Sequence, residues 1–263
     1  MNIRPILIFI LSLLTFSCSD ISEDERLIYV EPISPEPLKE SRRVLLEDFT
    51  GQRCVNCPNA SDEISLLQSE YGSDNVIAVG IHSGPLAFYS SNNLLGLRTS
   101  SGDIYYDHWD LEYQPVGLVN RRGPFQPTLW HSRVRDALQE TSNISILCTA
   151  TLSTPELIQI ETTVKGLEGT TNGYLQLWLV EDKVKAFQFM PDNSMNRDYV
   201  HNHVFRSPIN GQWGEEISVS EDVSITKEHS ISVDDAWNVS NLSVIAFVYN
   251  KTGVEQVTRT QLK

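Results

Sequence analysis

Three patterns of apolar and polar residues divide the chain into consecutive parts. A predominantly apolar run, residues 5–16, follows Arg4, which is the only charge before it. This run suits the core of a signal peptide and falls short of the ~20 residues that a membrane-spanning helix needs. We therefore expect residues 1–17 to be a signal peptide and the protein to be exported.

Residues 18–40 show no periodicity of a folded segment and contain Pro32, Pro35 and Pro37. Linkers with several prolines are extended and act as semi-rigid spacers. We expect this segment to be a tether that holds the folded part of the chain away from a membrane.

The second pattern, over residues 41–141, alternates strand-like and helix-like segments. Residues 44–49 and 76–81 are short apolar runs of the kind that forms buried strands. Between them, apolar residues recur at helical spacing over 58–71, and Gly72 closes the segment. The pattern predicts a strand–helix–strand unit of an α/β domain.

After residue 141 the pattern changes to strict alternation. Ile144, Ile146 and Cys148 alternate with polar residues, so we expect Cys148 to face a core as a small apolar side chain. Seven more strand-like segments follow, several of them separated by turn signals. This succession predicts an all-β antiparallel Ig-like sandwich over residues 142–263.

Charge limits the partners of the chain. Its 263 residues include 34 Asp and Glu against 20 Lys and Arg, for a formal charge of −14. Such a surface cannot neutralise phosphates and release their counterions, which argues against nucleic acid as a partner. The hydrophobic fraction of 40% excludes a disordered chain, and 4 Cys are too few for a miniprotein held together by disulfides.

Cys54 and Cys57 form a CxxC pair directly before the predicted helix. Two intervening residues allow both sulfurs onto the first helical turn, where unpaired N–H groups and the helix dipole favour a thiolate. The charge of Arg53 favours the same form. We expect Cys54 to be an exposed nucleophile that attacks a disulfide, and Cys57 to resolve the mixed disulfide.

Two other roles for the cysteine pair stay open. In an oxidising compartment the pair can form a permanent disulfide with a structural role. Metal ligation needs a second pair of ligands, which His201 and His203, alternate residues of an expected strand, could supply only across the domain boundary. We expect no metal and no cofactor.

The surroundings of the pair resemble the thioredoxin superfamily. Asp48 matches the Asp of the family's strand-end Asp-Phe, and Pro115 lies where the family has its cis-proline loop. The resemblance implies that Asp48 assists proton transfer from Cys57 and that the loop at Pro115 pairs with substrate backbone. The sequence departs from the family at Arg53, in place of the usual Trp, and in a long insertion over residues 83–112.

Two N-terminal segments resemble export signals. Residues 14–18, Leu-Thr-Phe-Ser-Cys, resemble the lipobox of bacterial lipoproteins, with the usual Leu displaced by one place. This implies that Cys18 carries the lipid. The acidic residues 19–25 resemble the signal that sends lipoproteins of Bacteroidetes to the cell surface.

A closer resemblance extends over most of the exported chain. Residues 49–58, 115–121 and 201–206 are similar to the family of twenty-eight-kilodalton outer-membrane lipoproteins of Bacteroidetes. The resemblance implies a cell-envelope protein that a lipid anchors to the outer membrane, with surface exposure as a further expectation.

Two functions follow as hypotheses. The first is thiol–disulfide exchange with exported protein thiols or disulfides. The alternative is a non-enzymatic surface binding or adhesion protein, in which the CxxC is a structural disulfide.

Overall fold

The computed structural model describes residues 40–263, which belong to one compact unit. The expected signal peptide, Cys18 and nearly all of the tether lie outside the described residues. The helices are α2 (Cys57–Tyr71), α3 (Ser100–His108), α4 (Pro127–Ala137) and the 3-10 helix η1 (Val239–Asn241). The strands are β1 (Glu40–Ser41), β2 (Val44–Thr50), β3 (Val76–His82), β4 (Val116–Val119), β5 (Arg122–Phe125), β6 (Thr141–Ser142), β7 (Ile144–Thr154), β8 (Leu157–Gly166), β9 (Thr170–Glu181), β10 (Val184–Phe189), β11 (Met195–His201), β12 (Val204–Pro208), β13 (Glu215–Ser220), β14 (Ser224–Ser232), β15 (Leu242–Asn250) and β16 (Gly253–Gln261).

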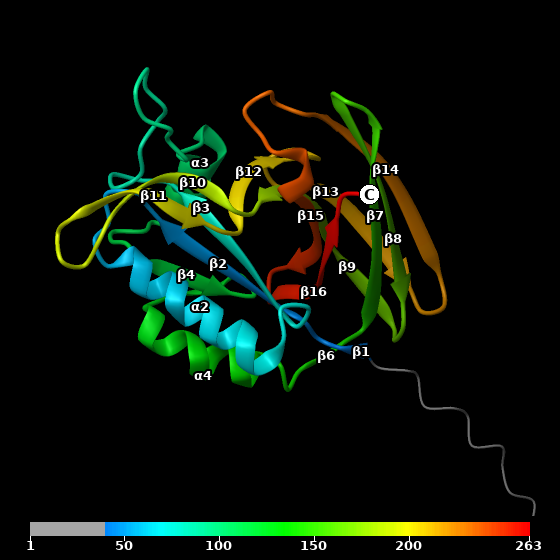
Figure 1. Cartoon of the computed structure of the whole chain (residues 1–263). Coiled ribbons are helices and arrows are strands. Elements are labelled where there is room, and N and C mark those ends of the chain that lie inside the picture. Colours follow the sequence, from blue (N-terminus) through cyan, green and yellow to red (C-terminus); the bar gives the residue numbers. More distant parts are fainter. Residues whose placement is uncertain (1–39) are drawn as a thin grey trace, which may run out of the picture. The chain divides into compact units, whose positions relative to one another are not determined.

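A nine-stranded sheet runs through the unit (Figure 1). Its order is β16-β15-β9-β12-β3-β2-β4-β5, and β13 pairs with β9 outside this path. Strand β3 is parallel to both of its neighbours, β2 and β12, whereas the other pairs in the sheet are antiparallel. The predicted strand–helix–strand unit is therefore present as β2-α2-β3.

Strands β2 and β3 are buried on both faces, which explains their nearly continuous apolar sequences. On one face, Val44 and Leu46 pack with residues of α2 and α4. On the other face, Leu45 and Phe49 pack with Tyr105 of α3 and with strands from the second half of the sequence. The middle of the sheet thus lies between two layers, with α2 and α4 together on one side (Figure 1).

A second, three-stranded sheet, of order β14-β8-β7, is antiparallel throughout. Its buried residues share a core with those of β9, β13 and β15. Ile144, Ile146 and Cys148 all contribute to this core, as the alternation predicts, and Cys148 is a buried free thiol. The predicted antiparallel β-structure of residues 142–263 is confirmed.

The boundary expected at residue 141 does not separate two cores. Phe49 and Tyr105 share one core with Trp178, Phe205 and Phe247. The alternating pattern predicts an Ig-like sandwich for the later strands, but β12 pairs with β3 and joins both regions in one sheet. The expectation of two independently packed domains is corrected to one compact unit.

We expect a fragment that ends at residue 141 not to fold by itself. Removal of β12 leaves one edge of β3 without a pairing strand, and Phe49 and Tyr105 lose the aromatic residues that bury them. Circular dichroism and size-exclusion chromatography of fragment 40–141, with 40–263 as the control, test this. A monomeric fragment that unfolds cooperatively would contradict it.

Candidate functional site

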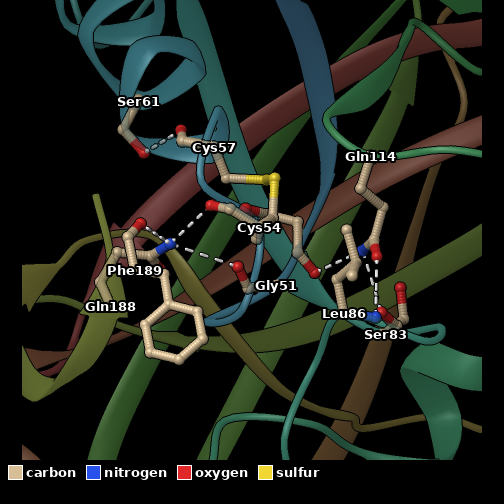
Figure 2. The surroundings of a disulfide bond; sticks show 10 residues. Gly51, Cys54, Cys57, Ser61, Ser83, Leu86, Gln114, Gln188 and Phe189 are labelled. Atoms are coloured by element: carbon tan, nitrogen blue, oxygen red, sulfur yellow. Dashed lines mark hydrogen bonds between the residues drawn. A yellow bond between two sulfur atoms is a disulfide. The ribbon is translucent and has the colours of Figure 1, made fainter. Parts of the chain in front are cut away.

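The CxxC pair lies at the N-terminus of α2, as predicted. Cys57 is the first residue of the helix, and Pro58 occupies its first turn. Cys54 precedes the helix in a turn, in which the Cys57 N–H donates to the Cys54 carbonyl oxygen at 3.3 Å. The two residues form a disulfide with a Cα–Cα distance of 5.4 Å (Figure 2).

The disulfide is buried, which corrects the expectation of an exposed Cys54. Cys54 and Cys57 are each only 2% exposed. The side-chain amide of Gln188, at the end of β10, donates to the carbonyl oxygen of Cys54 at 2.9 Å. The Arg53 N–H donates to the carbonyl oxygen of Leu86, from the insertion, at 2.9 Å. Two segments remote in sequence thus cover the pair from different sides (Figure 2).

Arg53 itself is exposed and lies against an aromatic ring. Its guanidinium carbon is 4.9 Å from the ring centroid of Phe88, which in turn contacts Phe187 of β10. The sequence analysis placed the charge of Arg53 beside Cys54. In the structure this side chain also links the insertion to the CxxC turn.

Asp48 lies buried near the end of β2. It is 2% exposed, and its Oδ1 atom has no hydrogen-bond partner. Burial raises the pKa of Asp48 from 3.8 to about 8. The parallel register places Asp48 beside Gly80 and Thr50 beside His82, so these four residues continue the sheet face that α2 covers.

Asp48 and Cys57 line one polar cavity of about 340 Å³. The cavity lies at the carboxyl ends of β2 and β3, where ligands of parallel sheets commonly bind. Its wall also includes His82, Tyr199 and His201. A cavity of this size and polarity has room for water between the carboxyl group and the resolving cysteine.

The sequence did not predict that two histidines lie side by side in this cavity. The ring centroids of His82 and His201 are 5.2 Å apart, and both side chains are buried. His82 Nδ1 and His201 Nε2 have no hydrogen-bond partner. Burial lowers the pKa of His82 well below its usual range and that of His201 to about 4, so both rings are neutral at pH 7.

The sequence indicates the place of His82 only weakly: the residue follows the apolar run of β3 and lies on the same face of the sheet as Gly80. It does not indicate the place of His201, since only the tertiary fold brings β11 to this site. His203 does not share a strand face with His201. It lies between β11 and β12 at a φ of +57°, and its Nδ1 atom is 3.3 Å from Asp182.

Pro115 lies at a second site beside α2. The Gln114–Pro115 bond is cis, and the Gln114 side chain donates to the carbonyl oxygens of Thr50 at 2.7 Å and Ser83 at 2.9 Å. Pro115 lines a groove of about 380 Å³ together with Asn56, Ala60, Glu63, Tyr113 and residues 126–128. The structure thus places Asp48 and Pro115 in two separate hollows on either side of the start of α2.

Fold and site together define a β-rich protein whose α/β layer holds a CxxC disulfide at a helix N-terminus. The chain belongs to the Omp28 family, because the model of the family described as outer membrane protein Omp28 matches residues 102–263. The resemblance inferred from sequence is confirmed, and the protein is one of the outer membrane. The matched range does not include Cys54 and Cys57.

Two solved structures, both of proteins from Porphyromonas gingivalis, are similar to this chain. HBP35 has a TM-score of 0.64 at 16% identity, covering 85% of this chain and 76% of its own, and so shares the fold. A domain of the outer membrane lipoprotein Omp28 matches at 25% identity with a TM-score of 0.35, covering 46% of this chain and 89% of its own.

Comparison with curated proteins finds no match. Within residues 40–263, no helix combines the length and the hydropathy needed to cross a membrane.

We expect Asp48→Asn to remove a cost to stability that grows with pH. Because the pKa of Asp48 is about 8 in the folded chain, the folded chain keeps a proton that the unfolded chain releases above its ordinary pKa of 3.8. Folding therefore loses up to about 1.4 kcal/mol per pH unit in this window.

Urea unfolding of the oxidised protein between about pH 5 and pH 8 measures this effect. The difference in free energy of unfolding between Asp48→Asn and the parent should rise steadily with pH. Asp74→Asn, which removes an exposed carboxylate, serves as the control. A pH-independent difference for Asp48→Asn would show that Asp48 is ionised in the folded chain.

Proposed function

We propose that the chain is an envelope protein that exchanges disulfides with exported proteins through a thioredoxin-like site. The observation that carries the proposal is the shared cavity of Cys57 and the buried, unpartnered carboxyl group of Asp48. A buried carboxyl with a pKa near 8 is ionised in about one tenth of the molecules at pH 7, and this ionised form is basic enough to accept a proton from a thiol. Such perturbed groups concentrate at functional sites.

The exchange has two steps. In the reduced protein the Cys54 thiolate attacks one sulfur of a partner disulfide, and the other partner sulfur leaves as a thiolate that takes up a proton. Cys57 then passes its proton to Asp48 and attacks the Cys54 sulfur, which releases the second partner thiol. The cysteine pair loses two electrons and the partner gains them. With a partner dithiol, the same steps run in reverse.

The surroundings of Cys57 suit the second step. Desolvation favours the neutral thiol, so the resolving cysteine needs a base within its own cavity. His82 and His201 are neutral there and offer unpartnered ring nitrogens, which can pass the proton onward from Asp48 through water. The groove beside Pro115 is the surface that we assign to a partner backbone.

The first step requires that Cys54 become accessible. Gln188 and Leu86 hold the covering segments against residues 51–54 through hydrogen bonds to main-chain atoms. Each such bond contributes about 1 kcal/mol, and opening of the hairpin formed by β10 and β11 also exposes the buried side chains of Val184, Ala186 and Phe187, so it costs more than these bonds alone. Opening of this hairpin therefore becomes part of the proposed mechanism.

One observation favours the alternative function. A disulfide that is 2% exposed at both cysteines is protected from thiol attack, as a structural disulfide would be. Under this alternative, the chain is a non-enzymatic surface binding or adhesion protein of the outer membrane. The two functions differ in whether Cys54 ever reacts with a partner.

We expect Cys57→Ser to trap mixed disulfides through Cys54. The first attack remains possible in this variant, whereas the resolving attack is lost. After incubation with a model disulfide peptide, mass spectrometry should find the adduct on Cys54. Cys54→Ser is the matched control and should form no adduct at Cys57, which lies deeper in the helix and beside Asp48. Absence of an adduct in both variants favours the structural disulfide.

The lipid anchor is a second part of the proposal. Cys18 lies outside the described residues, and its role rests on the lipobox-like residues 14–18. We expect Cys18→Ala to release the protein from the membrane fraction into a soluble exported form, because two or more acyl chains are needed for stable anchoring. Membrane fractionation, with Cys148→Ala as the control, tests this. Unchanged membrane association of Cys18→Ala would exclude the anchor.

A further inference from the structure

The hairpin of β4 and β5 places a buried arginine beside an aromatic pocket. Asn120 and Arg121 form the two-residue turn of this hairpin, at φ values of +52° and +59°. Arg121 is 7% exposed. Its guanidinium carbon lies 3.8 Å from the ring centroid of Tyr249 and 4.9 Å from that of Phe247, which are cation–π distances.

The guanidinium of Arg121 lacks partners for its polar atoms. Its Nε and Nη2 atoms are buried and donate to no hydrogen-bond acceptor within the described residues. The neighbouring carboxylate, Glu47, has its Oε1 atom 3.8 Å from Nε, too far for a hydrogen bond, and neither of its oxygens has a donor. Burial of an unsatisfied charged group is costly, so this arrangement requires an explanation.

The pocket beside Arg121 has the size and chemistry of a ligand site. Its volume is about 520 Å³, within the range of small-molecule pockets. The walls are mainly aromatic: they include His108, Trp109, Tyr174, Trp213 and Tyr249. The indole Nε1 atom of Trp109 is also buried without a partner, which supplies a second unused donor next to the pocket.

The charge of the pocket differs from that of the whole chain. Arg121, Arg122 and Lys251 line it, whereas no acidic residue of the described chain is among its lining residues. This contrasts with the formal charge of −14. Arg122 pairs with Glu140 at 2.6 Å, whereas among the described residues Arg121 forms only the 3.8 Å ion pair with Glu47 and makes no hydrogen bond through Nε or Nη2.

We propose that this pocket binds a small molecule with a planar ring and one carboxylate. The carboxylate pairs with the Arg121 guanidinium, and the ring packs against Tyr249 and Trp213. A phosphate is a poorer match, because the walls are mainly hydrocarbon. The proposal is independent of disulfide exchange, since the pocket shares no residue with either hollow beside α2.

Titration of the full chain with phenylacetate, followed by the indole N–H signals in NMR spectra, tests the proposal. The signals of Trp109 and Trp213 should shift in a saturable manner, whereas those of Trp130 and Trp237, which pack in other cores, should not. Trp109→Phe and Trp213→Phe assign the two signals. Phenylacetamide has the same shape without the charge and should bind at least about tenfold more weakly.

Arg121→Gln should weaken the binding of phenylacetate at least about tenfold, and Trp237→Phe should leave it unchanged. The comparison of acid and amide needs no variant, so it decides the question even if Arg121→Gln fails to fold. The proposal is overturned if phenylacetate gives no saturable shift, if the amide binds as tightly as the acid, or if Arg121→Gln folds and binds normally.

Discussion

The parallel pairing of β12 with β3 is the interaction on which both the core and the disulfide site depend. The Gly80 N–H donates to the carbonyl oxygen of His203 at 2.8 Å, and Val204 lies in register with Gly80. This contact joins the first α/β region to the later antiparallel strands. Because the β10–β11 hairpin directly precedes β12, the same contact carries Gln188 and His201 to the cysteines.

The sheet face beneath α2 changes its chemistry along its length. Val44, Leu46 and Ala78 fill it with apolar side chains, whereas Asp48 and His82 follow at the carboxyl ends of the same strands. Buried polar groups without partners cost stability, and apolar residues would fit this face better. Local departures from the rules of a stable core are expected where a site performs chemistry. The face is therefore an apolar core at one end and the wall of a polar cavity at the other.

Local patterns in the sequence predicted most of the site, but not the segments that bury the disulfide. Short apolar runs, helical spacing and the position of Gly72 defined β2-α2-β3, and Asp48 could be placed because it lies within one of these strands. The pairing of β12 with β3 depends on residues far apart in the chain, and no local period encodes it. For the same reason the sequence indicated an exposed Cys54 and related His201 to the cysteines only as a metal ligand paired with His203.

The reduction potential of the Cys54–Cys57 pair tests the central claim most directly. Equilibration of the purified chain with glutathione buffers, followed by thiol alkylation and mass spectrometry, gives this potential. An exchange site predicts a value above about −300 mV, together with a pair that equilibrates with glutathione. A value below about −300 mV, in a pair that glutathione does not reduce, would contradict the account and assign the disulfide a structural role.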